Sequence, residues 1–168
     1  MEDYARILAG RVPEPVGSDR ESLVREFKRL QSVRIHSYQH FNSALFDLVR
    51  EGRLAAYSEV CSHFTPIFND ISSAVRQVRD RLETESGILA RIISKIQEIE
   101  KTKLVVQTKY HMAYLSAHSS LDFSSHVSNS EEEYISKIRR LEELVNEEMD
   151  NLQSALCEDI GLDDARIS

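Results

Sequence analysis

One segment of the chain repeats apolar residues at alternating spacings of three and four over nine consecutive positions. These positions are Leu54, Tyr57, Cys61, Phe64, Phe68, Ile71, Val75, Val78 and Leu82. The spacing places all nine side chains on one face of an α-helix, whereas a half-buried strand would alternate with a period of two. Pro66 lies within the segment, but the stripe keeps its phase across it. We therefore predict one long helix that Pro66 kinks but does not end.

Three other segments carry apolar stripes with the same period. The first is interrupted by Arg34 and Ser37, the third is interrupted only by Lys103, and the last extends from Tyr134 to Leu156. Together the four stripes predict helices over residues 19–50, 53–86, 88–117 and 131–158.

Residues that break helices are rare in this chain, which has five glycines and three prolines among 168 residues. Sandwiches and barrels need a turn every ~8 to 12 residues, so an all-β fold is excluded. Gly52 and Gly87 fall at short joints between helices of similar length, which favours antiparallel neighbours. We predict an all-α, elongated antiparallel bundle of three long helices over residues 18–118, joined by a fourth, more loosely tethered acidic helix.

The remaining segments are expected to be less regular. Glycine and proline gather in residues 1–17, which predicts an irregular N-terminal arm, and serines fill a predicted loop over residues 119–130. A tail is expected over residues 159–168. The pairs Ser18 with Glu21 and Ser130 with Glu133 have the spacing of capping boxes at helix starts.

Several features indicate an intracellular protein, either nuclear or cytoplasmic. The longest apolar runs have four residues, against ~20 for a membrane span. The N-terminal segment contains Glu2 and Asp3 and has no apolar stretch typical of a signal peptide. Cys61 and Cys157 lie far apart, which suits a reducing compartment. We expect no contact with a membrane.

Candidate chemical sites are few. His36 and His40 share a helix face, but no further residue has the spacing of a metal ligand. Cys61 falls on the apolar stripe, where a packing role is expected. We therefore predict no catalytic residues, no metal, no cofactor and no small-molecule substrate.

Charge is distributed unevenly along the chain, with a net charge of +2 over residues 1–118 and −9 over residues 119–168. Basic side chains on the first and third helices are candidates for contact with a partner or a phosphate: Arg25, Lys28, Arg29, Arg91 and Lys95. They are also compatible with solvated faces or with holding the acidic fourth helix. Ser128 and Ser130 precede three glutamates and are candidate phosphorylation sites for an acid-directed kinase, although capping is the main role expected of Ser130.

Two groups of residues resemble a known family. They are Leu30-Gln31-x-x-Arg34 with Tyr38 and Phe41, and Ile96-Gln97-x-Ile99-Glu100-x-Thr102-Lys103-Leu104. Both resemble the Required-for-excision 1-B domain family, small eukaryotic proteins linked to DNA excision repair. The resemblance covers residues 22–115. It implies a repair-linked role and transfers no catalytic residue.

We expect a non-enzymatic helical adaptor or scaffold that contacts protein partners whose identity the sequence does not give. Apolar residues outside the main stripes are typical either of helix-in-groove contacts or of a broader core: Val33, Ile35, Val49, Leu104, Val105 and Ile135. One alternative is a structural subunit of an axonemal or cytoskeletal assembly, located in the cilium or cytoskeleton. A third is weak, direct nucleic-acid binding through the basic faces of the first and third helices, which is not favoured.

Overall fold

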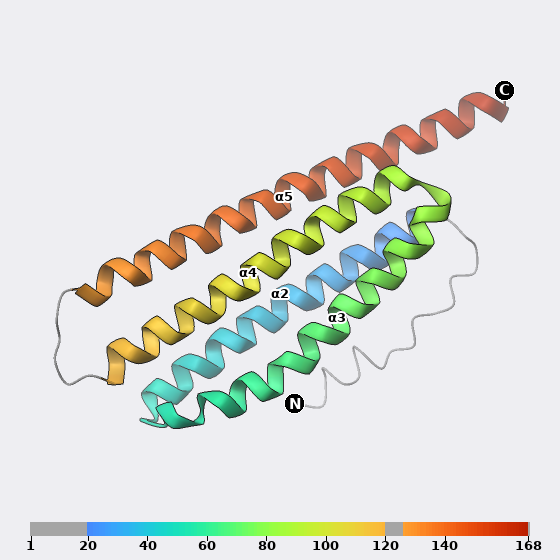
Figure 1. Ribbon diagram of the computed structural model, residues 1–168. Helices are drawn as coiled ribbons and strands as arrows, with labels where there is room; N and C mark the ends of the chain where they lie inside the picture. The colour runs from blue at the N-terminus through green and yellow to red at the C-terminus, as the bar shows by residue number, and fades with distance from the viewer. Residues whose placement is uncertain (1–19, 120–125, 168) are drawn as a thin grey trace.

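The computed structural model describes residues 20–119 and 126–167, and within the second range it describes side chains for residues 130–158. The described chain forms four long helices that lie side by side (Figure 1). These are α2 (Arg20–Arg50), α3 (Tyr57–Glu85), α4 (Gly87–Ser119) and α5 (His126–Ile167), with a 3₁₀ turn η1 (Leu54–Ala56) before α3. The predicted all-α antiparallel bundle is therefore confirmed. The predicted arm over residues 1–17 and the cap at Ser18 lie outside the described residues.

The first three helices begin and end within a few residues of the predicted bounds, and α3 continues through Pro66. The fourth helix differs at both ends. It begins at His126, inside the predicted serine-rich loop, and it continues to Ile167, through the predicted tail. Ser130 consequently lies within α5 and does not cap it. Serine is only mildly unfavourable inside a helix, so a cap-like residue does not prevent a helix from starting further upstream.

Two short joints produce the antiparallel arrangement. At the end of α2, Arg53 N–H donates to Leu48 O (2.9 Å) and Gly52 N–H donates to Val49 O (3.1 Å). This is a Schellman motif, and Gly52 has the positive φ of 68° that it requires. Between α3 and α4, Ser86 alone has an extended backbone. Because the joints are this short, each helix packs antiparallel to the one before it.

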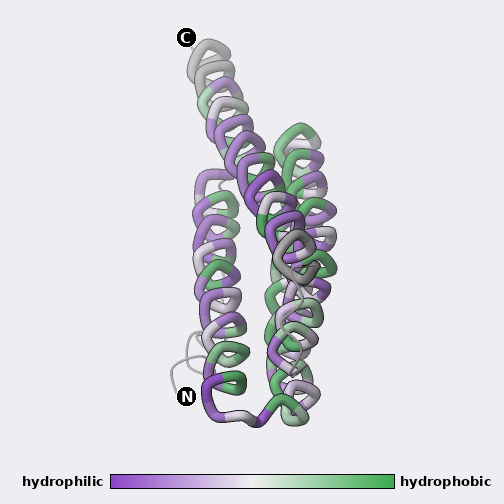
Figure 2. The backbone as a smooth tube through the Cα atoms, turned by 90° about the vertical axis from the view of Figure 1, so that its left-hand side faces the viewer, coloured by the Kyte–Doolittle hydropathy of each residue, from purple (hydrophilic) through white to green (hydrophobic). Residues whose placement is uncertain are grey.

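The buried apolar residues form two clusters of different chemistry. One is mainly aliphatic and includes Leu30, Ile71, Leu82 and Ile93. The other is rich in aromatic side chains and occupies the opposite half of the bundle, near the α2–α3 joint. Figure 2 shows the hydrophobic positions recurring along each helix, as the stripes predict.

On α2 and α4 a polar layer lies between these two clusters, which meet on α3 at Ile67. It consists of the buried side chains Gln31, Arg34 and Ser37 of α2 and Glu100 and Lys103 of α4. Three of the five are the residues at which the predicted stripes are interrupted. The interruptions therefore lie inside the bundle, and they do not mark solvent-facing turns.

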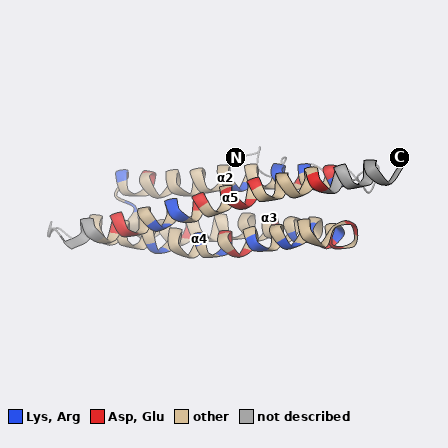
Figure 3. Cartoon of the chain, turned by 90° about the horizontal axis from the view of Figure 1, so that it is seen from above, with Lys and Arg blue, Asp and Glu red and all other residues tan. Residues whose placement is uncertain are grey.

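Helix α5 packs mainly along α4. It is closely packed around residues 148–156, because Leu152 is fully buried and Leu156 nearly so in the aliphatic cluster. Towards its N-terminus, no side chain between Ser130 and Glu147 is fully buried. The predicted loose attachment therefore describes only this N-terminal part. Acidic residues predominate on α5 (Figure 3), and within the described ranges no helix has an apolar stretch long enough to cross a bilayer.

Candidate binding groove between α3 and α4

A groove between α3 and α4 contains two adjoining pockets. The larger has a volume of about 410 Å³ and the smaller about 210 Å³, and both are lined by Phe68, Asn69 and Leu104. Polar and charged residues make up most of the lining of the larger pocket, the polar pocket, whereas the surface of the smaller, the apolar pocket, is predominantly apolar. Pockets of a few hundred Å³ lined by apolar surface and a few polar groups are typical of binding sites.

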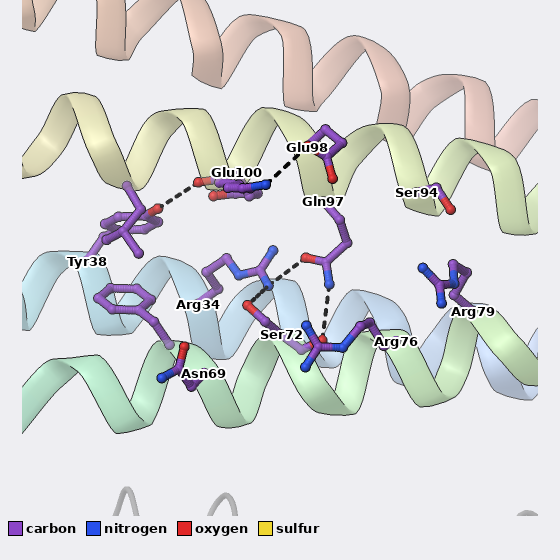
Figure 4. Close-up of a pocket in the computed structure, with 13 residues that line it drawn as sticks. Arg34, Tyr38, Asn69, Ser72, Arg76, Arg79, Ser94, Gln97, Glu98 and Glu100 are labelled. Atoms are coloured by element: carbon purple, nitrogen blue, oxygen red, sulfur yellow. Dashed lines mark hydrogen bonds and ion pairs between the residues drawn. The ribbon is translucent and has the colours of Figure 1, made fainter.

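Arg34 of α2 lies at the centre of the polar pocket (Figure 4). Its Nη2 donates to Gln97 Oε1 (2.8 Å) and to Ser72 Oγ (3.3 Å). Gln97 Nε2 in turn donates to the main-chain oxygen of Ser72 (3.2 Å), so α3 and α4 together hold the guanidinium. Arg34 is only 2% exposed, and its Nη1 has no hydrogen-bond partner.

The electrostatics of the pocket are dominated by burial. Burial lowers the pKa of Arg34, and the negative charge of Glu100 partly offsets this effect. Burial also raises the pKa of Tyr38, whose hydroxyl donates to the main-chain oxygen of Glu100 (3.3 Å). Oε2 of Glu100 has no hydrogen-bond partner. Arg34 and Glu100 thus balance each other's charge while each keeps one polar atom unbonded.

Further charged side chains stand around the rim of the polar pocket. Arg76 of α3 is exposed and forms no ion pair within the described part of the chain. Arg79 is held by Asp80 (2.5 Å, Nη2 to Oδ1), and Lys101 lies 3.9 Å from Glu98 Oε2. The rim is therefore predominantly basic.

The apolar pocket is built on packed aromatic rings. The ring centroid of Phe41 lies 5.1 Å from that of Phe64 and 6.0 Å from that of Phe68. On α4, Val105 and Met112 follow the lining residues Lys101 and Thr108 by one turn each, so they lie along the same edge of the groove. They are 53% and 56% exposed, and they extend the apolar surface beyond the pocket.

His111 belongs to a buried hydrogen-bond network below the aromatic cluster. A neutral imidazole ring fits both hydrogen bonds: Nε2–H donates to Asn42 Oδ1 (2.7 Å), and Nδ1 accepts from the Tyr57 hydroxyl (3.0 Å). Burial lowers the pKa of His111 to about 4. Within the described residues, no three His, Cys, Asp or Glu side chains are grouped so that they could hold a metal ion.

The predicted basic contact residues lie at one end of the bundle, because α2 and α4 both begin there. Lys28 and Lys95 face α5: Lys28 donates to Gln153 Oε1, and Lys95 Nζ lies 2.5 Å from Glu148 Oε1. Arg29 pairs with Glu26 on its own helix (2.7 Å) and Arg91 donates to Gly87 O (3.2 Å). Arg25 is exposed.

Of the basic candidates, Lys28 and Lys95 therefore match the alternative in which these residues hold the acidic helix α5. Of the candidate phosphorylation sites, Ser130 is exposed on α5, and the side chain of Ser128 lies outside the described residues.

The off-stripe apolar residues separate into two groups. Ile35, Val105 and Ile135 are exposed, whereas Val33 is buried in the aliphatic cluster. Val49 and Leu104 are partly buried against the aromatic cluster. The three exposed residues are thus compatible with surface contacts, and the other three belong to a broader core.

Sequence reasoning missed the polar pocket, although it noted two of the buried residues around it. Arg34 and Lys103 occupy slots of otherwise apolar stripes, and Arg34, Tyr38, Gln97 and Glu100 belong to the residues that carry the family resemblance. A charged residue in a core-facing slot must find partners inside the bundle. That signal could have identified the polar layer, but not the opening between α3 and α4.

Comparison with curated proteins and with solved structures found no match for the chain. The family model described as DNA repair REX1-B matches residues 22–114, which cover α3 and almost all of α2 and α4. The match includes the polar layer and both pockets, and it spans more than half of the chain. This protein therefore belongs to the DNA repair REX1-B family.

Proposed function

We propose that this protein is a non-enzymatic helical adaptor in DNA excision repair, located in the nucleus or cytoplasm, that contacts protein partners through the groove between α3 and α4. The observation that carries this proposal is the apolar surface at one end of the groove. Val105 and Met112 remain more than half exposed beside a pocket lined by Phe41, Phe64 and Phe68. Exposed apolar side chains that adjoin a pocket are typical of sites where a partner helix or segment binds.

Membership in a family described by DNA repair supports the biological context of the proposal. The organisation of the bundle supports an adaptor role, because a rigid frame of long helices can present one groove at a fixed position. The basic surfaces of α2 and α4 give less support to nucleic-acid binding, since Lys28 and Lys95 already contact α5.

The test is proximity labelling in ultraviolet-irradiated cells with the full-length protein. A double variant, Val105→Glu with Met112→Glu, places two charges on the apolar edge of the groove. Ile88→Glu is the matched control, because Ile88 is a similarly exposed residue of α4 that lies at the start of the helix, far from the apolar pocket at Leu104 and Thr108.

We expect repair proteins among the labelled partners of the wild type and of the control, and their loss with the double variant. Circular dichroism would establish that all three proteins keep their helical content. Equal labelling by the three proteins would contradict the role of the groove. Labelling of axonemal or cytoskeletal proteins in place of repair proteins would favour the structural-subunit alternative.

A further inference from the structure

We propose that the polar pocket between α3 and α4 is a binding site for a phosphate monoester group. The starting observation is Nη1 of Arg34, a donor on an almost completely buried side chain that has no hydrogen-bond partner. A buried donor without a partner costs free energy, and the cost is larger for a charged group. The same guanidinium lines the pocket, so an anion bound there would offset part of this cost through its charge.

Cationic groups approach the pocket from three helices. Arg34 comes from α2 and forms the floor, and Arg76 stands on α3 (Figure 4). Lys101 lines the pocket from α4. Arg76 is exposed and has no ion pair among the described residues. Lys101 is held only by a 3.9 Å contact with Glu98, and both side chains are about three-quarters exposed. Such a contact contributes little, so Lys101 is available to a ligand.

The positions of these donors favour a tetrahedral group over a planar one. A carboxylate presents two oxygens in one plane, which suits a single guanidinium. A phosphate monoester presents three oxygens in different directions and carries a charge of about −1.5 to −2 at pH 7. Donors on the floor and on both walls match that arrangement.

Acidic groups near the pocket lower its positive charge without abolishing it. Glu98 and Glu100 line the pocket, and Asp80 beside it takes up Arg79. Arg34, Arg76 and Lys101 then face two carboxylates, which leaves an excess of positive charge. The net charge around the pocket is therefore positive, so the attraction increases with the charge of the anion and favours a phosphate monoester over a singly charged group.

The volume of about 410 Å³ indicates that the phosphate is carried by a larger group. A small phosphate ester and a phosphorylated side chain of a partner share the same monoester. The pocket would bind either of them whether or not the apolar end of the groove binds a protein.

Calorimetric titration of the full-length protein with inorganic phosphate and with O-phosphoserine tests the proposal. We expect saturable binding that Arg76→Gln weakens roughly tenfold, the loss typical of one charge-assisted hydrogen bond. Arg34→Lys should weaken binding by at least as much, because lysine lacks the second terminal nitrogen. Arg25→Gln is the matched control, an exposed arginine of α2 outside the pocket, and should leave binding unchanged.

Three further ligands distinguish the possible sources of the phosphate group from one another and from other ligand classes. Tighter binding of a phosphoserine peptide than of free O-phosphoserine would indicate a partner segment, and equal binding would indicate a small ester; both support the monoester site. Acetate that binds as tightly as phosphate, duplex DNA that displaces phosphoserine, or equal losses with Arg76→Gln and Arg25→Gln would each overturn the proposal. If Arg34→Lys fails to fold, Arg76→Gln still decides the outcome, because Arg76 is exposed.

Discussion

The ammonium group of Lys103 lies 3.0 Å from Glu142 Oε1, so a buried cation of α4 has its ion-pair partner on α5. The side chain of Lys103 is 7% exposed, whereas that of Glu142 is 52% exposed. The same ammonium lies 4.4 Å from the centre of the Tyr38 ring on α2. Lys103 therefore connects α2, α4 and α5 at the level of the polar layer.

Replacing Glu142 by glutamine should lower the free energy of unfolding by about 1 kcal/mol. The substitution leaves a buried ammonium without its carboxylate, although solvent near Glu142 reduces the cost. Urea denaturation measures the change, and Glu143→Gln is the control because the ion-pair partner of Glu143 among the described residues is the exposed Arg140. In a Lys103→Met background, Glu142→Gln should have almost no effect. An equal effect in both backgrounds would show that the pair does not act as a unit.

Leu152→Ala should destabilise the protein by about 2–5 kcal/mol, the range for removing a fully buried leucine side chain. Because Leu152 is the most deeply buried apolar residue among the described side chains of α5, hydrogen exchange should also accelerate along that helix first. Asn151→Ala, on the exposed face, should change stability by less than about 0.5 kcal/mol. Unaltered exchange in α5 of the Leu152 variant would mean that other contacts hold the helix.

Stability should fall between pH 7 and pH 5 because of His111. Its pKa is about 4 in the folded protein and about 6.5 in an unfolded chain. As the pH falls below 6.5 the unfolded chain therefore binds a proton that the folded protein does not. The free energy of unfolding should decrease by about 2 kcal/mol over this range. The decrease should be smaller by this amount in His111→Gln, measured by urea denaturation at each pH; identical pH profiles would refute the assignment.

The two glycines at the joints should respond to alanine in opposite directions. Gly52→Ala should destabilise the protein by about 1 kcal/mol, because a φ of 68° is unfavourable for any residue with a Cβ even though the space around it is open. Gly87→Ala should stabilise it by about 0.5 kcal/mol, since a Cβ there would meet only Glu83 Oε1 at 4.0 Å. Thermal unfolding of both variants measures the contrast, which a shared sign would contradict.

Most of the fold follows from the apolar stripes. The nine positions between Leu54 and Leu82 specify one helix because each misplaced turn would expose several of them. The start of α5 was not predictable in the same way, since Ser130 and Glu133 fit both a cap and the interior of a helix. Glu133 in fact pairs with Lys137 (2.5 Å) inside α5.

The candidate site was harder to predict than the fold. The stripes identify Arg34 and Lys103 as exceptions, but the width of the groove depends on how far α3 and α4 separate along their lengths. That separation results from the packing of side chains on three helices. The spacing of residues within one helix does not determine it. The basic residues of the first and third helices were easier to identify, yet part of that charge is taken up by α5.

The polar layer also bears on the longitudinal alignment of the helices. Uniform apolar stripes would pack nearly as well if one helix slid past its neighbours by seven residues, because the same face would still point inward. In this bundle such a shift would move Arg34 among aliphatic side chains and carry Lys103 away from Glu142. Charges buried in that way would be left uncompensated. The polar layer therefore favours this longitudinal alignment over alignments shifted by seven residues. The polar residues that interrupt the apolar stripes thus specify how far each helix is shifted along the others.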